Sequence, residues 1–217
     1  MSAARSAMIL AAGRGERLRP LTDRTPKPLI EVRGKPLIVW HLHALQRAGI
    51  ESVAINVSWL AGRITEALGD GSDFGLDIRY SHEPEALETA GGIVQALPQL
   101  GDPFIVVNGD VFTDFDFAQL TLSDDEDARL VLVPNPPWHA SGDFALSDGR
   151  LANRGEPRHT FSGIGIYRKR LFAGLPPGRR PLAPLLRKAA DAGRIGAELH
   201  RGLWSDVGTA ERLEALR

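Results

Sequence analysis

The chain alternates short, wholly apolar runs with stretches in which apolar residues recur every three or four positions. The runs 7–11 and 104–108 predict strands that are buried on both faces. The stretch 37–48 has the helical period, with Pro36 near its first turn and Gly49 at its end. The same criteria predict strands at 52–57 and 76–80 and helices at about 60–68 and 89–97. Helices between strands imply right-handed crossovers and a largely parallel sheet.

The pattern changes after residue 128. Strand-like runs follow one another closely at 130–133, 143–146 and 161–167, and Asp148-Gly149 is a hairpin turn signal. These strands are expected to add an antiparallel part to the sheet. The last elements predicted are a helix at 182–192, a short strand at 204–207 and a helix at 209–216. Because no repeat or linker interrupts the chain, we expect one domain over 1–217. Its predicted fold is α/β, with a Rossmann-like, mixed but mostly parallel central sheet flanked by helices.

The composition is that of an ordinary soluble globular protein, with 217 residues, 43% apolar and 24% charged. A net charge of −1 argues against nucleic acid and anionic membrane as partners. The absence of cysteine excludes thiolate catalysis, disulfides and cysteine-ligated zinc. No run resembles a secretory signal or approaches the ~20 apolar residues of a membrane span, so a cytoplasmic location is expected. The composition predicts no particular oligomeric state.

The loop after the first strand carries the most distinctive chemistry, because open α/β sheets bind ligands beyond the carboxyl ends of their strands. Gly13 and Gly15 allow backbone N–H groups to approach phosphate oxygens closely. Basic residues gather in and after this loop: Arg14, Arg17, Arg19, Arg24 and Lys27. Taken alone, the composition fits a solvated basic turn as well as an anion-binding loop. No Gly-Lys-Ser/Thr follows, and Leu18 replaces the third glycine of the dinucleotide fingerprint, so both of those motifs are excluded.

A longer motif surrounds this loop. Residues 10–22 (LAAGRGERLRPLT), followed by Pro26-Lys27-Pro28-Leu29, resemble the signature of the sugar-nucleotide pyrophosphorylase (nucleotidyltransferase) family. The resemblance extends to about residue 210. It implies the nucleotide-diphospho-sugar transferase type of fold, with a nucleotide-binding half at about 1–127 and a sugar-binding half at about 128–217. The loop would wrap a nucleoside triphosphate through Ala11, Ala12, Gly13 and Gly15. Arg17 on the β- and γ-phosphates and Lys27 on the α-phosphate and the incoming sugar phosphate would be the catalytic cations.

Two aspartates are candidate metal ligands. Asp110 follows the strand at 104–108, and Asp206 precedes the last predicted helix. Either carboxylate alone fits a turn or a cap. Both match metal-binding elements of the family, "GD" after the central strand and "W-x-D-V-G-T" near the end. Two carboxylates, phosphate oxygens and waters suit Mg2+, which is rarely held by protein ligands alone.

The same resemblance assigns residues to the base and the sugar. Glu83 occupies the place where the family reads the base, and Thr89 begins the helix beside it. A carboxylate accepts hydrogen bonds, so Glu83 suits the N–H groups of uracil or guanine, and adenine is not excluded. The sugar contacts implied are Asn108, Gly142 and Glu156. The stretch Arg154-Gly155-Glu156-Pro157 departs from the Glu-Lys-Pro element of the family, and no lysine is left for the sugar phosphate. Arg158 and Lys169 are candidate replacements, although both also fit ordinary surface charges.

The resemblance implies in-line transfer of a nucleotidyl group to a sugar 1-phosphate, with release of pyrophosphate. The substrates predicted are UTP and N-acetylmuramic acid 1-phosphate, because the chain looks most like the N-acetylmuramate 1-phosphate uridylyltransferases of bacterial cell-wall recycling. The alternatives are guanylyl transfer to mannose 1-phosphate and, from another class, a non-catalytic nucleotide-binding module. His41 and His43 point to different faces of one predicted helix, which is poor metal-ligand geometry. Trp59 and Trp138 are assigned to packing.

Overall fold

The computed structural model describes residues 2–217, and within them the central sheet has nine strands in the order β10-β14-β12-β11-β13-β7-β2-β5-β6. In chain order these are β2 (Ser6–Leu10), β5 (Ser52–Val57), β6 (Asp77–His82), β7 (Phe104–Asn108), β10 (Ala128–Val133), β11 (Phe144–Ser147), β12 (Arg150–Ala152), β13 (Arg158–Tyr167) and β14 (Ile195–Leu199). Three two-stranded pairs accompany it: β1 (Ser2–Ala3) with β9 (Thr121–Leu122), β3 (Glu31–Val32) with β4 (Lys35–Pro36), and β8 (Val111–Thr113) with β15 (Trp204–Asp206).

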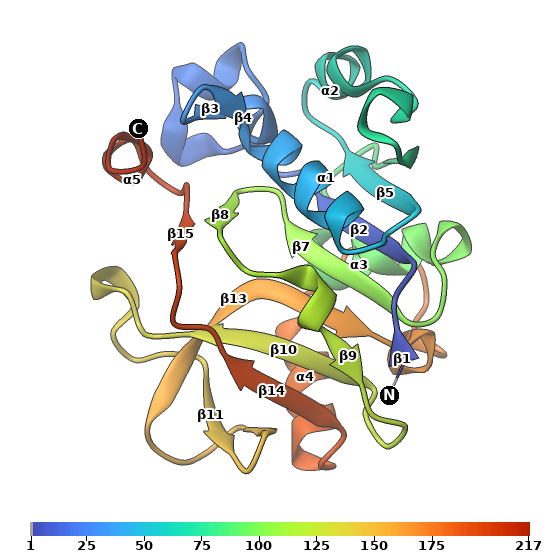
Figure 1. The fold of residues 1–217 in the computed structure, drawn as a ribbon, viewed down its shortest axis with the longest axis vertical. Coiled ribbons are helices and arrows are strands. Elements are labelled where there is room, and N and C mark those ends of the chain that lie inside the picture. Colours follow the sequence, from blue (N-terminus) through green and yellow to red (C-terminus); the bar gives the residue numbers. More distant parts are fainter. Residues whose placement is uncertain (1) are drawn as a thin grey trace.

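Helices cover both faces of the parallel part of the sheet, which consists of β7, β2, β5 and β6. Neighbouring residues of a strand point to opposite faces. Thus Ile9 and Val107 pack with α1 (Leu37–Arg47) and α2 (Ala61–Leu68). Met8 packs on the other face with α3 (Glu88–Ala96) and α4 (Ala183–Asp191). Figure 1 shows α1 in front of the sheet and α3 behind it. This double burial explains why β2 and β7 are apolar at successive positions.

The second half of the chain extends the same sheet by strands that pair mostly antiparallel, as expected, and β10 with β14 is the parallel pair among them. β13 pairs with β7, and β10 pairs with both β13 and β14. The strands β10, β14, β12, β11 and β13 therefore form a closed ring of neighbours. The predicted fold class is confirmed. No helix among residues 2–217 is long and apolar enough to cross a bilayer.

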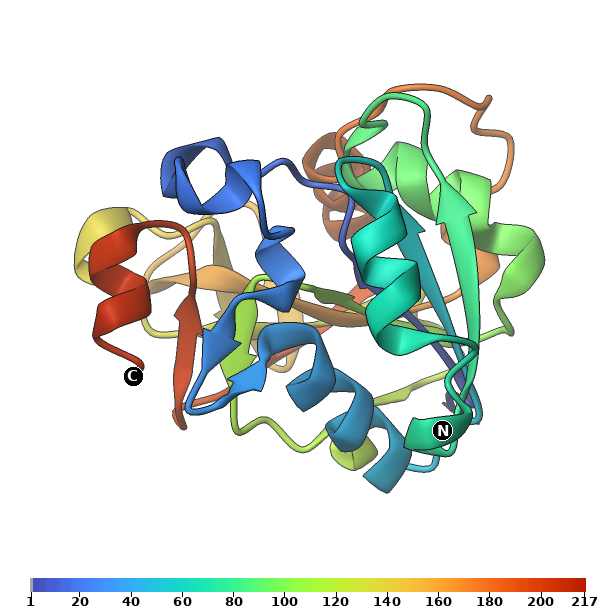
Figure 2. The same ribbon diagram turned by 90° about the horizontal axis from the view of Figure 1, so that it is seen from above.

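Some elements differ from the sequence-based expectation. The strand β14 and the short β8 and β12 are absent from the predicted set. A glycine interrupts β14, and three-residue strands carry too little alternation to be recognised. The loop after β2 contains three short 3-10 turns: Glu16–Leu18, Leu21–Asp23 and Lys27–Leu29. The last helix, α5 (Ala210–Glu214), packs on this loop through Leu213 and Leu18. Figure 2 shows the two side by side, although they come from opposite ends of the sequence.

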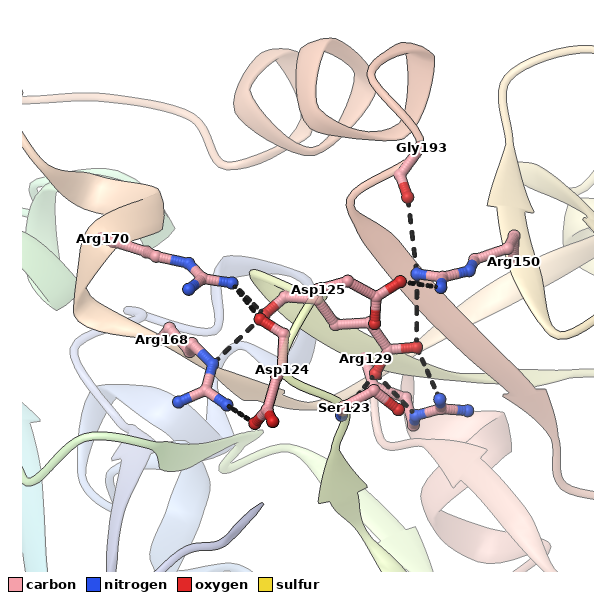
Figure 3. Close-up of polar contacts among 9 residues, drawn as sticks. Ser123, Asp124, Asp125, Arg129, Arg150, Arg168, Arg170 and Gly193 are labelled. Atoms are coloured by element: carbon pink, nitrogen blue, oxygen red, sulfur yellow. Dashed lines mark hydrogen bonds and ion pairs between the residues drawn. The ribbon is translucent and has the colours of Figure 1, made fainter. Parts of the chain in front are cut away.

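An acidic turn at residues 124–127 lies between β9 and β10 and is surrounded by guanidinium groups (Figure 3). Glu126 is 1% exposed, and its carboxylate accepts from Arg129 Nη2 at 2.5 Å and from the backbone N–H of Ser123 at 3.2 Å. Arg150 pairs with Asp125 and lies 3.6 Å from Glu126. The turn thereby connects β10 with β12 across the ring of strands.

Replacing Glu126 with alanine is expected to lower the free energy of unfolding by about 3 kcal/mol, because it removes the buried partner of Arg129 and of a backbone N–H. Asp124→Ala is the matched control. Asp124 is 94% exposed and lies 3.6 Å from Arg168, so its loss should cost less than about 1 kcal/mol. Urea unfolding of both variants measures the difference, and equal losses would contradict a special role for the buried carboxylate.

Candidate active site

Two connected cavities open at the carboxyl ends of the parallel strands. The first cavity, about 620 Å³, lies between the loop after β2, the end of β5 and the start of α3. The second cavity, about 360 Å³, lies between β13, the 136–139 turn and β15. Arg17, Asn108 and Asp110 line both of them. A ligand in each cavity would therefore meet the other at these three side chains.

The loop on the first cavity is held by contacts that depend on Gly15. This residue has a φ of 69°, and a Cβ there would lie 3.0 Å from the Thr22 methyl group. Thr22 Oγ1 donates to the Gly15 carbonyl at 2.9 Å, and Trp59 Nε1 donates to the Thr22 carbonyl at 3.0 Å. The Arg14 guanidinium lies 4.4 Å from the centre of the Trp59 ring. Trp59 is therefore a packing residue, as expected, and it packs against this loop.

A chain of hydrogen bonds joins the ends of three neighbouring strands below the first cavity. Asn56 Oδ1 accepts from the Ala11 N–H at 2.7 Å, and Asn56 Nδ2 donates to Glu83 Oε1 at 2.7 Å. Glu83 Oε2 accepts from the Leu87 N–H at 2.9 Å. Glu83 is only 4% exposed, and a Cβ on Gly92 would come within 2.6 Å of its carboxylate. Glu83 thus lines the cavity with both oxygens already accepting from protein donors.

Two cationic side chains, one buried and one exposed, lie near the junction of the cavities: Lys27 lines the first cavity and Arg17 lines both. Lys27 is 8% exposed, and its Nζ lies 2.5 Å from Asp110 Oδ2. Arg17 is exposed, and its guanidinium has no hydrogen bond or ion pair to any other residue in the described chain. The buried lysine is already neutralised by a carboxylate. The arginine is free to fork onto an anionic group.

Asp206 is brought beside Asp110 by the pairing of β15 with β8. Asp206 and Val111 are register partners, and the Val207 N–H donates to the Asp110 carbonyl at 2.7 Å. One oxygen of Asp206 accepts from Arg212, whereas the other, Oδ1, is buried without a hydrogen-bond partner among the described residues. A buried oxygen without a donor suits a cation. Two carboxylates fit Mg2+ completed by phosphate oxygens and water, and residues 2–217 offer no cluster of three or more His, Asp or Glu ligands.

A histidine lies buried below Asp110. His41 is 2% exposed, and its ring packs edge-on against Phe117 at 6.4 Å. Burial lowers the pKa of His41 to about 4, outweighing the backbone hydrogen bond with Val111 and the charge of Asp110. The imidazole is therefore neutral at pH 7, and it packs in the core.

Lowering the pH from 7 to 5 should destabilise the protein by about 2 kcal/mol through His41 alone. The folded pKa of about 4 lies below the unfolded value, so the unfolded chain takes up a proton that the folded chain refuses. The contribution of neutral His41 to the free energy of unfolding is complete above pH ~6.5 and is lost progressively as the pH falls toward 4. Urea unfolding at both pH values should show a smaller loss in His41→Leu, and identical losses would contradict the assignment.

Most of the predicted site residues line one of the two cavities, and two of them line neither. Ten of them line the first cavity: Ala11, Ala12, Gly13, Gly15, Arg17, Lys27, Glu83, Thr89, Asn108 and Asp110. Asp206 lines the second. Gly142 and Glu156 line neither cavity. Gly142 ends the turn after Pro137–His139, and exposed Glu156 accepts from the Arg158 N–H at 3.1 Å. Their contact with a sugar stays a prediction.

Two further residues at the cavities, Asn56 and Arg212, were not singled out from the sequence, and a third, Trp138, was assigned to packing. Asn56 is a buried amide in an otherwise apolar strand, a signal that could have been noticed. Trp138 is 49% exposed in the second cavity, and the Arg212 guanidinium lies 4.4 Å from its ring centre. Arg212 occupies one turn of a surface helix, and only the folded chain brings it to the cavity.

The comparisons with known proteins agree with this geometry. The model of the nucleotidyl transferase family matches residues 6–144. The chain belongs to this family. The N-acetylmuramate alpha-1-phosphate uridylyltransferase of Neisseria meningitidis serogroup B is 53% identical over 219 residues, 96% of this chain and 95% of the relative. This nucleotidyl transferase is thus an enzyme that joins nucleotides to sugar 1-phosphates.

Other members of the nucleotidyl transferase family are more distant. The catalytic subunit beta of Drosophila melanogaster mannose-1-phosphate guanylyltransferase is 43% identical over 118 residues, 52% of this chain and 32% of the relative. The structure of HddC from Yersinia pseudotuberculosis complexed with GMP-PN superposes with a TM-score of 0.81 at 23% identity. That superposition covers 98% of this chain and 97% of HddC. It shows the fold and confirms the predicted fold type.

Proposed function

We propose that the protein transfers UMP from UTP to N-acetylmuramic acid 1-phosphate in a Mg2+-dependent reaction, with release of pyrophosphate. The observation that carries the choice of substrates is the 53% identity to the Neisseria relative over nearly the whole of both chains. The product would be UDP-N-acetylmuramic acid. Its formation from a salvaged sugar phosphate fits a role in peptidoglycan recycling.

In this proposal the first cavity takes the nucleotide and the second takes the sugar phosphate. The N–H groups around Gly13 and Gly15 and the free guanidinium of Arg17 would bind the triphosphate. Lys27, which contacts Asp110 at the junction, would neutralise the α-phosphate and the attacking phosphate. Asn108, which lines both cavities, would be within reach of either substrate.

The sugar phosphate is ionised near pH 7 and needs no strong general base to become a nucleophile. Catalysis then rests on alignment of the two substrates and on neutralisation of charge at the α-phosphorus. Asp110 and Asp206 would hold the Mg2+, which supplies positive charge to the phosphate oxygens. The donor set and the buried Asp206 Oδ1 support this assignment.

A second candidate is guanylyl transfer to mannose 1-phosphate. It is favoured by the similarity to the Drosophila guanylyltransferase and by a carboxylate at position 83, which could accept from guanine. The hydrogen bonds from Asn56 and Leu87 to both Glu83 oxygens weaken this argument. We propose that Glu83 mainly shapes the nucleotide cavity.

Pyrophosphate release with a substrate panel tests the proposal. UTP, GTP, CTP and dTTP are each paired with N-acetylmuramic acid 1-phosphate, mannose 1-phosphate and glucose 1-phosphate. We expect the highest kcat/KM for UTP with N-acetylmuramic acid 1-phosphate. A preference for GTP with mannose 1-phosphate would replace the proposed substrates, and no pyrophosphate with any pair would reject the proposal as a whole.

A further inference from the structure

We infer that Arg212 binds the phosphate group of the sugar 1-phosphate, a role that rests on the proposed function and deepens it. The sequence leaves this phosphate without an assigned cation in the sugar-binding half, because residues 154–157 carry no lysine. The folded chain supplies one from an unexpected place, the first helical turn after β15.

The second cavity contains few positive charges. Its lining has two guanidinium groups, Arg17 and Arg212, and one imidazole, His139. His139 Nε2 lies 3.0 Å from Asp143 Oδ1 and is occupied by that carboxylate. Arg17 also lines the first cavity, where it faces the triphosphate. Arg212 is the guanidinium that belongs to the second cavity alone.

Most of the Arg212 donors are available. A guanidinium has five N–H groups. In the described chain one guanidinium nitrogen of Arg212, Nη1, has an acceptor, which is Asp206 Oδ2. The remaining N–H groups can fork onto a phosphate while the contact with Asp206 persists. Arg212 can therefore serve the substrate without releasing the proposed metal ligand.

The guanidinium is also held in position. Its side chain is 14% exposed, and its carbon lies 4.4 Å from the centre of the Trp138 ring. Thr209 Oγ1 accepts from the Arg212 N–H at 3.4 Å and so caps this helix. A flat cation fixed against an aromatic ring loses little freedom when it binds an anion. The ring and the carboxylate together orient the free edge of Arg212.

The two replacements considered from the sequence fit less well. Arg158 donates through Nη1 to the Asn153 carbonyl at 3.0 Å and through Nη2 to the Asp143 carbonyl at 2.5 Å. Lys169 follows the far end of β13. Neither residue lines the first or the second cavity.

Steady-state kinetics of Arg212→Gln and Arg212→Lys test the inference. Pyrophosphate release is measured with N-acetylmuramic acid 1-phosphate varied at saturating UTP, and then with UTP varied. Loss of a charge-assisted pair of hydrogen bonds should raise the KM for the sugar 1-phosphate about 10- to 100-fold in Arg212→Gln. The KM for UTP should stay within about twofold, since Arg212 lies outside the first cavity. Arg212→Lys should fall between these values.

Two further variants serve as a control and as a second test of the Arg212 site. Arg187→Gln is the matched control, because Arg187 also stacks on an aromatic ring, Phe144 at 5.0 Å, but lines neither cavity. It should leave both KM values unchanged. Trp138→Leu removes a ring that is 49% exposed and leaves the charge in place. It should raise the sugar 1-phosphate KM by about threefold or more even if the Arg212 variants do not fold.

An unchanged sugar 1-phosphate KM in the variants of Arg212 and Trp138 would overturn the inference. It would also be overturned if both KM values rose together and returned to normal at high Mg2+, because Arg212 would then merely support Asp206. Absence of pyrophosphate from the wild-type protein with every substrate pair rejects the proposed function itself, and that result is distinct from a defect confined to the variants.

Discussion

Asp110→Asn should reduce turnover by about 1,000-fold or more while leaving the fold intact. The amide keeps the size of the carboxylate but removes the charge that would hold Mg2+ at the junction of the cavities. The backbone contact that joins this position to β15 runs from the Val207 N–H to the carbonyl of residue 110 and survives the substitution. Circular dichroism should therefore match the wild-type protein, whereas urea unfolding should show a lower free energy of unfolding, because buried Lys27 loses its charged partner.

The matched control for this prediction is Asp114→Asn. Asp114 follows β8, lies 2.9 Å from His200 through its carboxylate, and lines neither the first nor the second cavity. Its replacement should leave turnover nearly unchanged. If Asp110→Asn kept its activity across a range of Mg2+ concentrations, the assignment of Asp110 as a metal ligand would be wrong.

Lys27→Met is expected to lower kcat by about 100- to 1,000-fold, and at the same time to lower the Mg2+ concentration needed for half-maximal rate. The lysine supplies charge at the reacting phosphates, and its loss removes that stabilisation. It also lies 2.5 Å from Asp110 and neutralises it. Without the ammonium group, the carboxylate is left with its full charge for the metal ion.

Initial rates over a Mg2+ titration measure both effects in one experiment. Lys35→Met provides the control, because Lys35 lies 4.7 Å from the Trp40 ring and lines neither cavity. It should change neither kcat nor the Mg2+ requirement. A higher Mg2+ requirement in Lys27→Met would show that the lysine assists metal binding instead of competing with it.

The sequence predicts the parallel half of the fold well for a physical reason. β2 and β7 are covered by helices on both faces, so nearly every residue in them is apolar, and the pattern is unambiguous. β14 lies in the closed ring of strands, is half apolar and contains Gly196. Its strand conformation depends on pairing with β10, which no local pattern encodes.

Some residues of the candidate site could be predicted from the sequence, and others could not. The loop after β2 carries a contiguous motif at residues 10–22, so its site residues could be predicted before the fold was known. The proximity of Asp206 to Asp110 depends on β15 pairing with β8, and residue chemistry alone does not predict it. The charge of Glu83 alone suggests that it accepts hydrogen bonds from a base. In the folded chain one of its oxygens already accepts from the Asn56 amide, and the sequence does not show this contact.

The ring closure of the sheet has a consequence for how this protein behaves at high concentration. Because β10 pairs on both sides, the described nine-stranded sheet has one open edge, β6. On the exposed positions of that strand, Asp77 and Arg79 form an ion pair at 2.6 Å. Charged side chains on an edge strand discourage pairing with a strand of another molecule. The architecture that frames the two cavities therefore also protects the chain from edge-to-edge aggregation.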